Sequence, residues 1–298
     1  MKKLMIVSIM LMAAFAAQAQ LKVAPKMEKG TTRTYATTMT ANIPRQGEMK
    51  MTADTKYTVS GTTADGYTLD VVTTDVTSDA AAGNIAGKLI AASQELMKGM
   101  TVSLATDKDG KIVKIMNFNE LKPKMDAAAG QLVDQLLKDV PQLSQLMSRE
   151  VLIARITDNV TEENLVRTMQ ANTSVLTLNG KTIMTGAQDE FVNEQGVKMK
   201  RMYFVNGKKV TTSSSMNMSK DEMKAFIIKQ VEQMAPSQAE MIKQNIDQVI
   251  ATGLLKIEMK ETADYEVGDD GWVRTLKSEA TTDAMGQKTT ITNVTTLK

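Results

Sequence analysis

Methionine pairs are the residues whose type and spacing come nearest to suiting a metal ion. They are Met49 with Met51, Met216 with Met218, and Met199 with Met202. A methionine thioether binds Cu(I), and residues two apart in a strand share a face. The same period of two is also what a half-buried strand requires, and the chain has no His or Cys to complete a copper site. We therefore predict strand positions here and no metal site.

Acidic residues offer two further chemistries. Asp107-x-Asp109-Gly110 resembles the start of a calcium loop, but Ala105 and Met116 stand where that loop needs oxygen ligands, so a hairpin turn is favoured. Paired carboxylates for glycosidic cleavage occur around one stretch, at Glu258, Glu261, Asp264 and Glu266. Acids that alternate along a strand more often mark a solvated face.

Nucleophiles and aromatic residues are few. Ser213, Ser214 and Ser215 lie in a predicted strand, and without His no residue of the usual kind can activate them. The lack of Cys excludes thiol chemistry and disulfides. Trp272, directly after a glycine-rich turn, suits either a strand anchor or a surface that stacks on a sugar or lipid. We expect no catalytic residue, no cofactor and no enzymatic activity.

The stretch 219–253 is predicted to form two amphipathic helices separated by Pro236. Ser219 with Glu222, and Ser237 with Glu240, have the spacing of capping boxes. Apolar residues recur every three or four positions, which puts them on one face. We take six of them as candidate ligand-binding residues: Met223, Phe226, Ile227, Met234, Met241 and Ile242. Flexible methionines suit varied apolar ligands, but they also fill ordinary cores.

The N-terminal residues predict export. Met1-Lys2-Lys3, an apolar run and Ala17-Gln18-Ala19 together have the form of a signal peptide over residues 1–19. No later run is long enough for an ordinary membrane-spanning helix. The net charge is +2 with both signs interspersed, so no nucleic-acid partner is expected. We place the mature chain in the periplasm or outside the cell, and not as an integral membrane protein.

The remaining pattern predicts an α+β fold over residues 20–298. Thr- and Val-rich segments with turn residues between them read as antiparallel strands at 31–43, 48–60, 67–71, 101–106, 111–116, 173–178, 181–186, 197–205, 208–216, 254–267, 272–282 and 289–297. Helices are expected at 79–98, 121–140 and 162–169. We predict one large, curved, half-barrel-like antiparallel sheet with amphipathic helices packed on one face.

A weak internal repeat accompanies this pattern. The hairpin at Gly110 precedes a helix that ends at Pro141, and the hairpin at Gly207 precedes the helix that ends at Pro236. Two related halves meeting near residues 150–170 would explain this spacing, and so would convergent use of the same hairpin and helix signals.

Several short motifs are similar to an uncharacterised secreted protein family of Bacteroides-type Gram-negative bacteria. They are the Thr-rich first strands, the hairpin from Val102-Ser103-Leu104 to Gly110 with its following helix, and Tyr265-Glu266-Val267-Gly268-Asp269 before Trp272. The layout also loosely resembles the lipoprotein-carrier and lipid-binding half-barrels of bacterial envelopes. That second resemblance implies a curved sheet closed by helices over an apolar cavity.

Two functions are consistent with the sequence. The first is an exported, non-enzymatic binding protein that carries a lipid or other apolar ligand between helices and sheet. The second is a structural or interaction protein of the bacterial envelope, whose partner is another protein and whose core is filled.

Overall fold

The protein is described by a computed structural model of the chain. It covers residues 20–298 except 46, 80–94, 96, 142–143, 145–146, 158–159, 173, 194, 235–239, 241–242, 247–256 and 285. The predicted signal peptide and most of the predicted helix at 79–98 lie outside the described residues.

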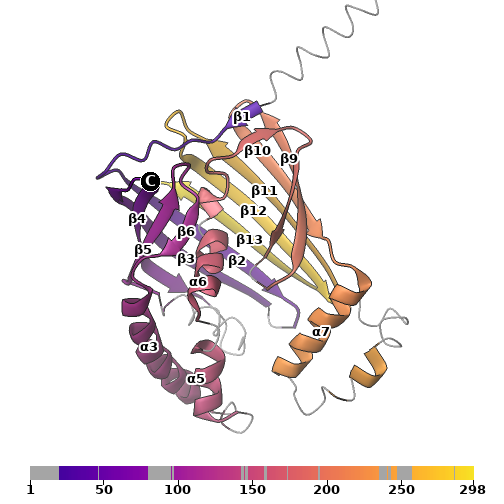
Figure 1. Cartoon of the computed structure of the whole chain (residues 1–298). Coiled ribbons are helices and arrows are strands. Elements are labelled where there is room, and N and C mark those ends of the chain that lie inside the picture. The colour runs from indigo at the N-terminus through magenta and orange to yellow at the C-terminus, as the bar shows by residue number, and fades with distance from the viewer. Residues whose placement is uncertain are drawn as a thin grey trace, which may run out of the picture.

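One antiparallel sheet of eleven strands forms the body of the protein (Figure 1). Its strands are β2 (Thr32–Ile43), β3 (Gly47–Thr62), β4 (Gly66–Ser78), β5 (Thr101–Asp107), β6 (Ile112–Ile115), β8 (Gln188–Val192), β9 (Lys198–Asn206), β10 (Lys209–Met216), β11 (Ile257–Val267), β12 (Val273–Ala284) and β13 (Gln287–Leu297). Their spatial order is β6-β5-β4-β3-β2-β13-β12-β11-β10-β9-β8. The sheet bends around one side without closing, so β6 and β8 remain its two edges.

The turn residues set the pairing of neighbouring strands as the sequence predicts. Asp107 bends the β5–β6 hairpin, because its carboxylate Oδ1 accepts the backbone N–H groups of Asp109 and Lys111. Asn206-Gly207 joins β9 to β10, with Gly207 in the left-handed conformation. Two strands outside the large sheet, β1 (Gln20–Lys22) and β7 (Thr182–Met184), pair with each other.

The helices stand on one side of the bend and at one end of the sheet (Figure 1). They are α3 (Phe118–Asp139), α5 (Arg149–Thr157), α6 (Glu162–Asn172), the 3-10 turn η1 (Ser174–Leu176) and α7 (Lys220–Met234). The capping box at the start of α7 forms as predicted. The Ser219 N–H donates to the Glu222 carboxylate, and the Glu222 N–H donates to the Ser219 hydroxyl.

The predicted strand at 173–178 is wrong. Residues 174–176 form η1, and a turn follows them. Val175, Leu176 and Leu178 are all buried in the main core. A strand sends consecutive residues to opposite faces, so it could not bury both Val175 and Leu176 against one core.

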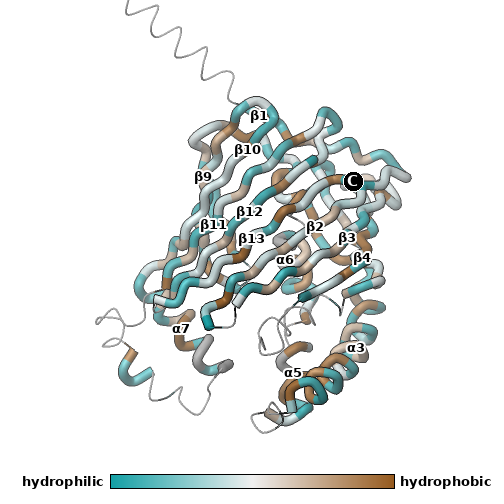
Figure 2. The backbone as a smooth tube through the Cα atoms, turned by 180° about the vertical axis from the view of Figure 1, so that it is seen from behind, coloured by the Kyte–Doolittle hydropathy of each residue, from teal (hydrophilic) through white to brown (hydrophobic). Residues whose placement is uncertain are grey.

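The main core lies against the inner face of the sheet, on the side of α6. It joins sheet residues such as Leu69 and Leu104 to Leu121 and Met125 of α3 and to Leu165 of α6. Along the central strands, seen from the outer side in Figure 2, most residues are hydrophilic or neutral. Threonines dominate there, including Thr38, Thr40, Thr290 and Thr292. The apolar side chains of the sheet therefore gather on the inner face, which is where an apolar ligand would bind.

Candidate functional site

A row of four polar side chains crosses the inner face near the β8 edge. The register pairs Asp189 of β8 with Arg201 of β9, Arg201 with Ser214 of β10, and Ser214 with Glu261 of β11. Arg201 is only 8 % exposed and Ser214 only 3 %. We call Asp189, Arg201, Ser214 and Glu261 the polar row. Charged residues are seldom buried in this way, so each needs a partner.

Only one of the two carboxylate oxygens of Asp189 accepts hydrogen bonds from the described residues. Its Oδ2 accepts from the Lys181 ammonium at 2.6 Å and from the Tyr203 hydroxyl at 2.6 Å. Burial alone would raise the pKa of Asp189, but these two donors hold it below its usual range. Burial raises the pKa of the Tyr203 hydroxyl. Tyr203 therefore stays protonated and acts as a hydrogen-bond donor to Asp189, which does not suit a general base.

Arg201 is fixed by stacking more than by hydrogen bonds. Its guanidinium carbon lies 4.0 Å from the centre of the Phe191 ring. Its Nη1 reaches the Tyr203 hydroxyl at 3.4 Å, and its Nε is 3.9 Å from Asp189 Oδ1, beyond hydrogen-bond range. Burial would lower the pKa of Arg201, but Tyr203, Tyr265 and Asp189 raise it, so the cation is retained.

Two buried oxygen atoms in the polar row have no hydrogen-bond partner within the described part of the chain. They are Asp189 Oδ1 and Ser214 Oγ, which belong to the two register neighbours of Arg201. An unsatisfied buried polar group costs about 1–3 kcal/mol, so native proteins rarely keep one without a reason. On the far side of Ser214, burial raises the pKa of Glu261, while Arg201 opposes this. The polar row can therefore form hydrogen bonds beyond those that it makes with the described residues.

An apolar cluster lies next to the polar row, toward α7. Val197, Met199 and Met259 are buried there, with Met216, Met218, Phe191, Phe226 and Ile257 packed against them. Phe226 is the contribution of α7. Phe191 belongs to this cluster and also stacks under Arg201, so it joins the apolar and the polar parts of the site.

The structure describes only some of the six candidate ligand-binding residues that the sequence suggested. Phe226 packs on the apolar cluster, Ile227 is buried at 4 % exposure, and Met223 is half-buried. Met241, Ile242 and the side chain of Met234 lie outside the described residues. A role in ligand binding stays a prediction for all six.

Beyond the polar row, the residues in the middle of the inner face are half-buried and not sealed. The register continues from Glu261 to Ala280 of β12 and Ile291 of β13. Both are half-buried, as are their outward-facing neighbours Thr281 and Thr292. Nearer one end of the same strands the inner face is sealed, with Leu276 at 1 % exposure. We call the half-buried inward residues of this region the open floor: Ser278, Ala280, Ile291, Asn293, Thr37, Met39 and Ala53.

The polar side chains of the open floor have hydrogen-bond partners on neighbouring strands. Thr37 Oγ1 lies 3.1 Å from Thr295 Oγ1, and Asn293 Nδ2 donates to Ser278 Oγ at 3.5 Å. The other members are Ala, Met and Ile. The open floor therefore presents mainly small apolar groups and pairs of satisfied polar groups.

The methionines and acidic residues considered for metal binding or glycosidic cleavage are distributed over both faces of the sheet. Met49 and Met51 are both buried on the inner face, but Met199 is buried whereas Met202 is exposed on the other face. No group of three or more His, Cys, Asp or Glu residues that could hold a metal occurs within the described ranges. Of the four acids proposed for glycosidic cleavage, Glu261 alternates with Thr262 and belongs to the inner face, whereas Asp264 is exposed outside.

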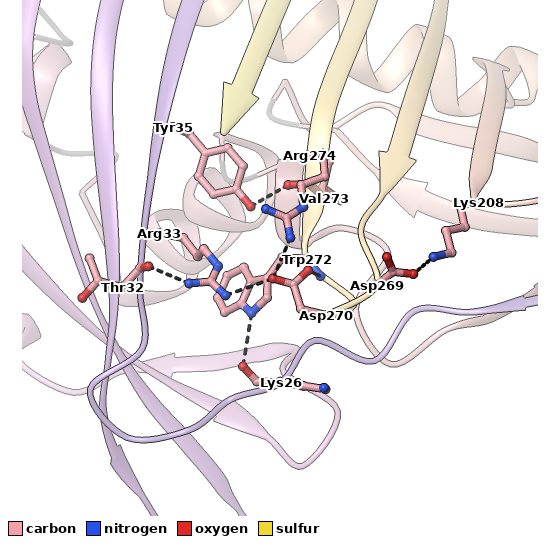
Figure 3. Close-up of polar contacts among 10 residues, drawn as sticks. All are labelled: Lys26, Thr32, Arg33, Tyr35, Lys208, Asp269, Asp270, Trp272, Val273 and Arg274. Atoms are coloured by element: carbon pink, nitrogen blue, oxygen red, sulfur yellow. Dashed lines mark hydrogen bonds and ion pairs between the residues drawn. The ribbon is translucent and has the colours of Figure 1, made fainter. Parts of the chain in front are cut away.

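Trp272 proves to be an anchor, in a second polar cluster at the sealed end of the sheet (Figure 3). It is 2 % exposed, and its indole N–H donates to the Lys26 carbonyl at 3.2 Å. Arg33 and Arg274 both contact Asp270 Oδ2, at 2.9 and 3.0 Å, and Arg33 lies 5.8 Å from the indole ring. These contacts tie residues 24–27 to the β11–β12 turn and to β2.

Sequence reasoning flagged Ser214 and Glu261 only as catalytic candidates and missed Asp189 and Arg201. A signal for Arg201 does exist, since it sits between Met199 and Tyr203 at an inward position of an alternating strand. A charged residue at such a position must be buried, which marks it for a special role. No comparable signal in the chain points to Asp189.

The solved structures to which the chain is similar include lipovitellin and a porin-like protein, both distant. No protein-family model matches the chain, and no curated protein does. The chain is similar to lipovitellin, from a structure titled for its lipid–protein interactions, at 9 % identity and a TM-score of 0.38 over 91 % of this chain. It spans only 25 % of the lipovitellin chain. A porin-like protein from Bacteroides uniformis matches at 9 % identity and a TM-score of 0.20, over 93 % of this chain and 98 % of its own. At these TM-scores neither likeness bears on the function proposed below.

The helices of the described residues include none with the length and apolar character needed to cross a bilayer.

Proposed function

We propose that the protein is an exported, non-enzymatic carrier that holds an apolar ligand against the inner face of its sheet. Support comes from one observation, the open floor. A sheet face turned toward helices and core is normally buried, yet Ala280 and Ile291 are only half-buried. Exposed apolar surface of this kind is where ligands gain the free energy of leaving water.

The size of the region suits one hydrocarbon chain. Four inter-strand steps separate β11 from β3, which is about 19 Å measured across the strands. One acyl chain spans half of a ~30 Å bilayer core, about 15 Å. Helix α7 (Lys220–Met234) would cover the bound chain from its end of the sheet, and the candidate residues Met223 and Ile227 would then contact it.

Export and the lack of enzymatic activity belong to the same proposal. Residues 1–19 have the form of a signal peptide, and a carrier of apolar molecules suits an aqueous compartment such as the periplasm. The internal duplication also stays a prediction, and the proposed binding site does not depend on it.

Substitution of Ala280 tests the proposal. Ala280→Phe places a ring on the open floor and should weaken binding of a fluorescent fatty acid to delipidated protein at least 10-fold. Thr281→Phe is the matched control, because it adds a ring at the next position on the outer face. It should leave the dissociation constant within twofold of the wild-type value. Equal loss in both variants, or no binding by folded wild-type protein, would contradict the proposal.

A further inference from the structure

The polar row lies at one end of the open floor, so a ligand on the floor would meet it. Ser214 and Glu261 share a cross-strand register with Ala280 and Ile291, and each step between them is one inter-strand spacing. An apolar chain on Ala280 and Ile291 therefore ends within reach of Ser214 and Arg201. The chemistry of the polar row decides which group the ligand carries at that end.

Arg201 is the one cation among the four residues of the polar row, and its contact with a carboxylate is long. Lys181 and Asp189 form an ion pair at 2.6 Å and balance each other. Arg201 keeps its positive charge, and its nearest carboxylate oxygen is 3.9 Å away. Burial raises the pKa of Glu261, while Arg201 opposes this.

The hydrogen bonding of Arg201 and Ser214 also favours an anionic group at this end of the ligand. Stacking on Phe191 fixes the guanidinium plane, and of its donors one makes a long contact of 3.4 Å to Tyr203. Ser214, the register neighbour of Arg201, carries a buried hydroxyl that lacks a partner within the described residues. A guanidinium and a hydroxyl side by side match the oxygen atoms of a carboxylate or phosphate.

We propose that the ligand of the open floor is an anionic amphiphile, whose carboxylate or phosphate head binds Arg201 and Ser214. This inference rests on the carrier function proposed above and adds the chemistry of the head group. The apolar chain lies across the strands from β11 to β3. The head group accepts hydrogen bonds from the Ser214 hydroxyl and the Arg201 guanidinium. A cationic head would instead meet the fixed positive charge of Arg201.

The test compares a fatty acid with its methyl ester, which has the same chain and no charge, on the delipidated mature protein. Wild type should bind the acid about 10-fold to 100-fold more tightly than the ester, as one or two charge-assisted hydrogen bonds would give. Arg201→Gln should bring this ratio close to one while ester binding stays. Ser214→Ala should lower the ratio by a smaller factor, and Arg274→Gln, at the sealed end, should leave it unchanged.

The ratio is measured within each variant, so a general loss of fold does not imitate the effect. Lysophosphatidic acid and the free fatty acid serve as separate probes, and the tighter one identifies a phosphate or a carboxylate head. Equal binding of acid and ester by wild type would overturn the anionic head group and leave the carrier function standing. Failure of both probes would overturn both proposals, and preference for an alkylamine would reverse the assigned charge.

Discussion

Gly271 and Gly286 allow the close packing at the sealed end to be measured against a matched control. Both have a positive φ, +78° and +75°, so alanine at either position costs about 1–2 kcal/mol for the left-handed backbone. Around Gly286 nothing lies within 4 Å of an added Cβ. At Gly271 that atom would stand 2.2 Å from the Ala24 carbonyl oxygen, more than 1 Å inside ordinary contact.

Relief of this clash requires residues 24–26 to move away from the β11–β12 turn. That movement strains the hydrogen bond from the Lys26 N–H to the Asp270 carbonyl at 2.9 Å and the bond from the Trp272 indole to the Lys26 carbonyl at 3.2 Å. Each contributes about 0.5–1.5 kcal/mol. Gly271→Ala should therefore lower the free energy of unfolding by about 2–5 kcal/mol, and Gly286→Ala by about 1–2 kcal/mol. Both variants gain the same small offset from a less flexible unfolded chain.

Urea unfolding followed by fluorescence measures both values, and Trp272 is the only tryptophan in the chain. Its indole lies at the perturbed contact, so its native emission should also change in Gly271→Ala and stay constant in Gly286→Ala. Losses that agree within about 0.5 kcal/mol would refute the reasoning, because the backbone conformation would then account for the whole effect.

Further predictions concern pH and helix capping. Burial would raise the pKa of Asp270, but Arg33, the Trp272 N–H and Arg274 hold it below its usual range. Its stabilising effect is thus complete above the ordinary aspartate pKa near 4 and is lost as the pH falls through the lower folded value. The stability gap between wild type and Asp270→Asn, measured by urea unfolding, should be constant above about pH 5 and shrink below about pH 4; a gap that widens in acid would contradict this. At α7, Ser219→Ala should cost about 0.5–2 kcal/mol of helix stability, seen as faster amide exchange in the first turn, with exchange in α3 as the unchanged internal control. Lys198 and Ser219 lower the pKa of Glu222 to about 2, so the capping box should persist until the pH approaches 2, whereas in Glu222→Gln, whose amide oxygen can still accept from the Ser219 N–H, it should not depend on this titration. Loss of the Ser219 and Glu222 amide NMR signals of the folded cap near pH 4 would show that this account is wrong.

Local turn chemistry was readable from the sequence because it depends on neighbours in the chain. Asp107 and Gly110 bend the first hairpin, Asn206-Gly207 bends another, and Ser219 caps α7, each through residues at most four positions apart. The stretch 173–178 was misread for the opposite reason. Its apolar residues look like a strand, and only their shared core shows that Val175 and Leu176 turn toward one place.

The candidate site was predictable only in part. Alternation placed Met49 and Met51 on one face, but their spacing could not show that this face is buried beside the open floor. The polar row combines residues 189, 201, 214 and 261, which only the register of four strands brings together. Single residues such as Glu261 therefore looked like part of a solvated face.

The sequence by itself determined most of the antiparallel strands, the turns of the hairpins, the cap of α7 and the absence of His and Cys chemistry, because each follows from composition or from short-range geometry. Tertiary structure alone decided that β2 pairs with β13, which joins the two ends of the described chain into one sheet. It also decided which inner positions are fully buried and which are half-buried, and that Arg201 lies buried beside Ser214, whose hydroxyl has no partner among the described residues. Pairing, burial and charge balance depend on residues up to hundreds of positions apart, and no local pattern in the chain encodes them.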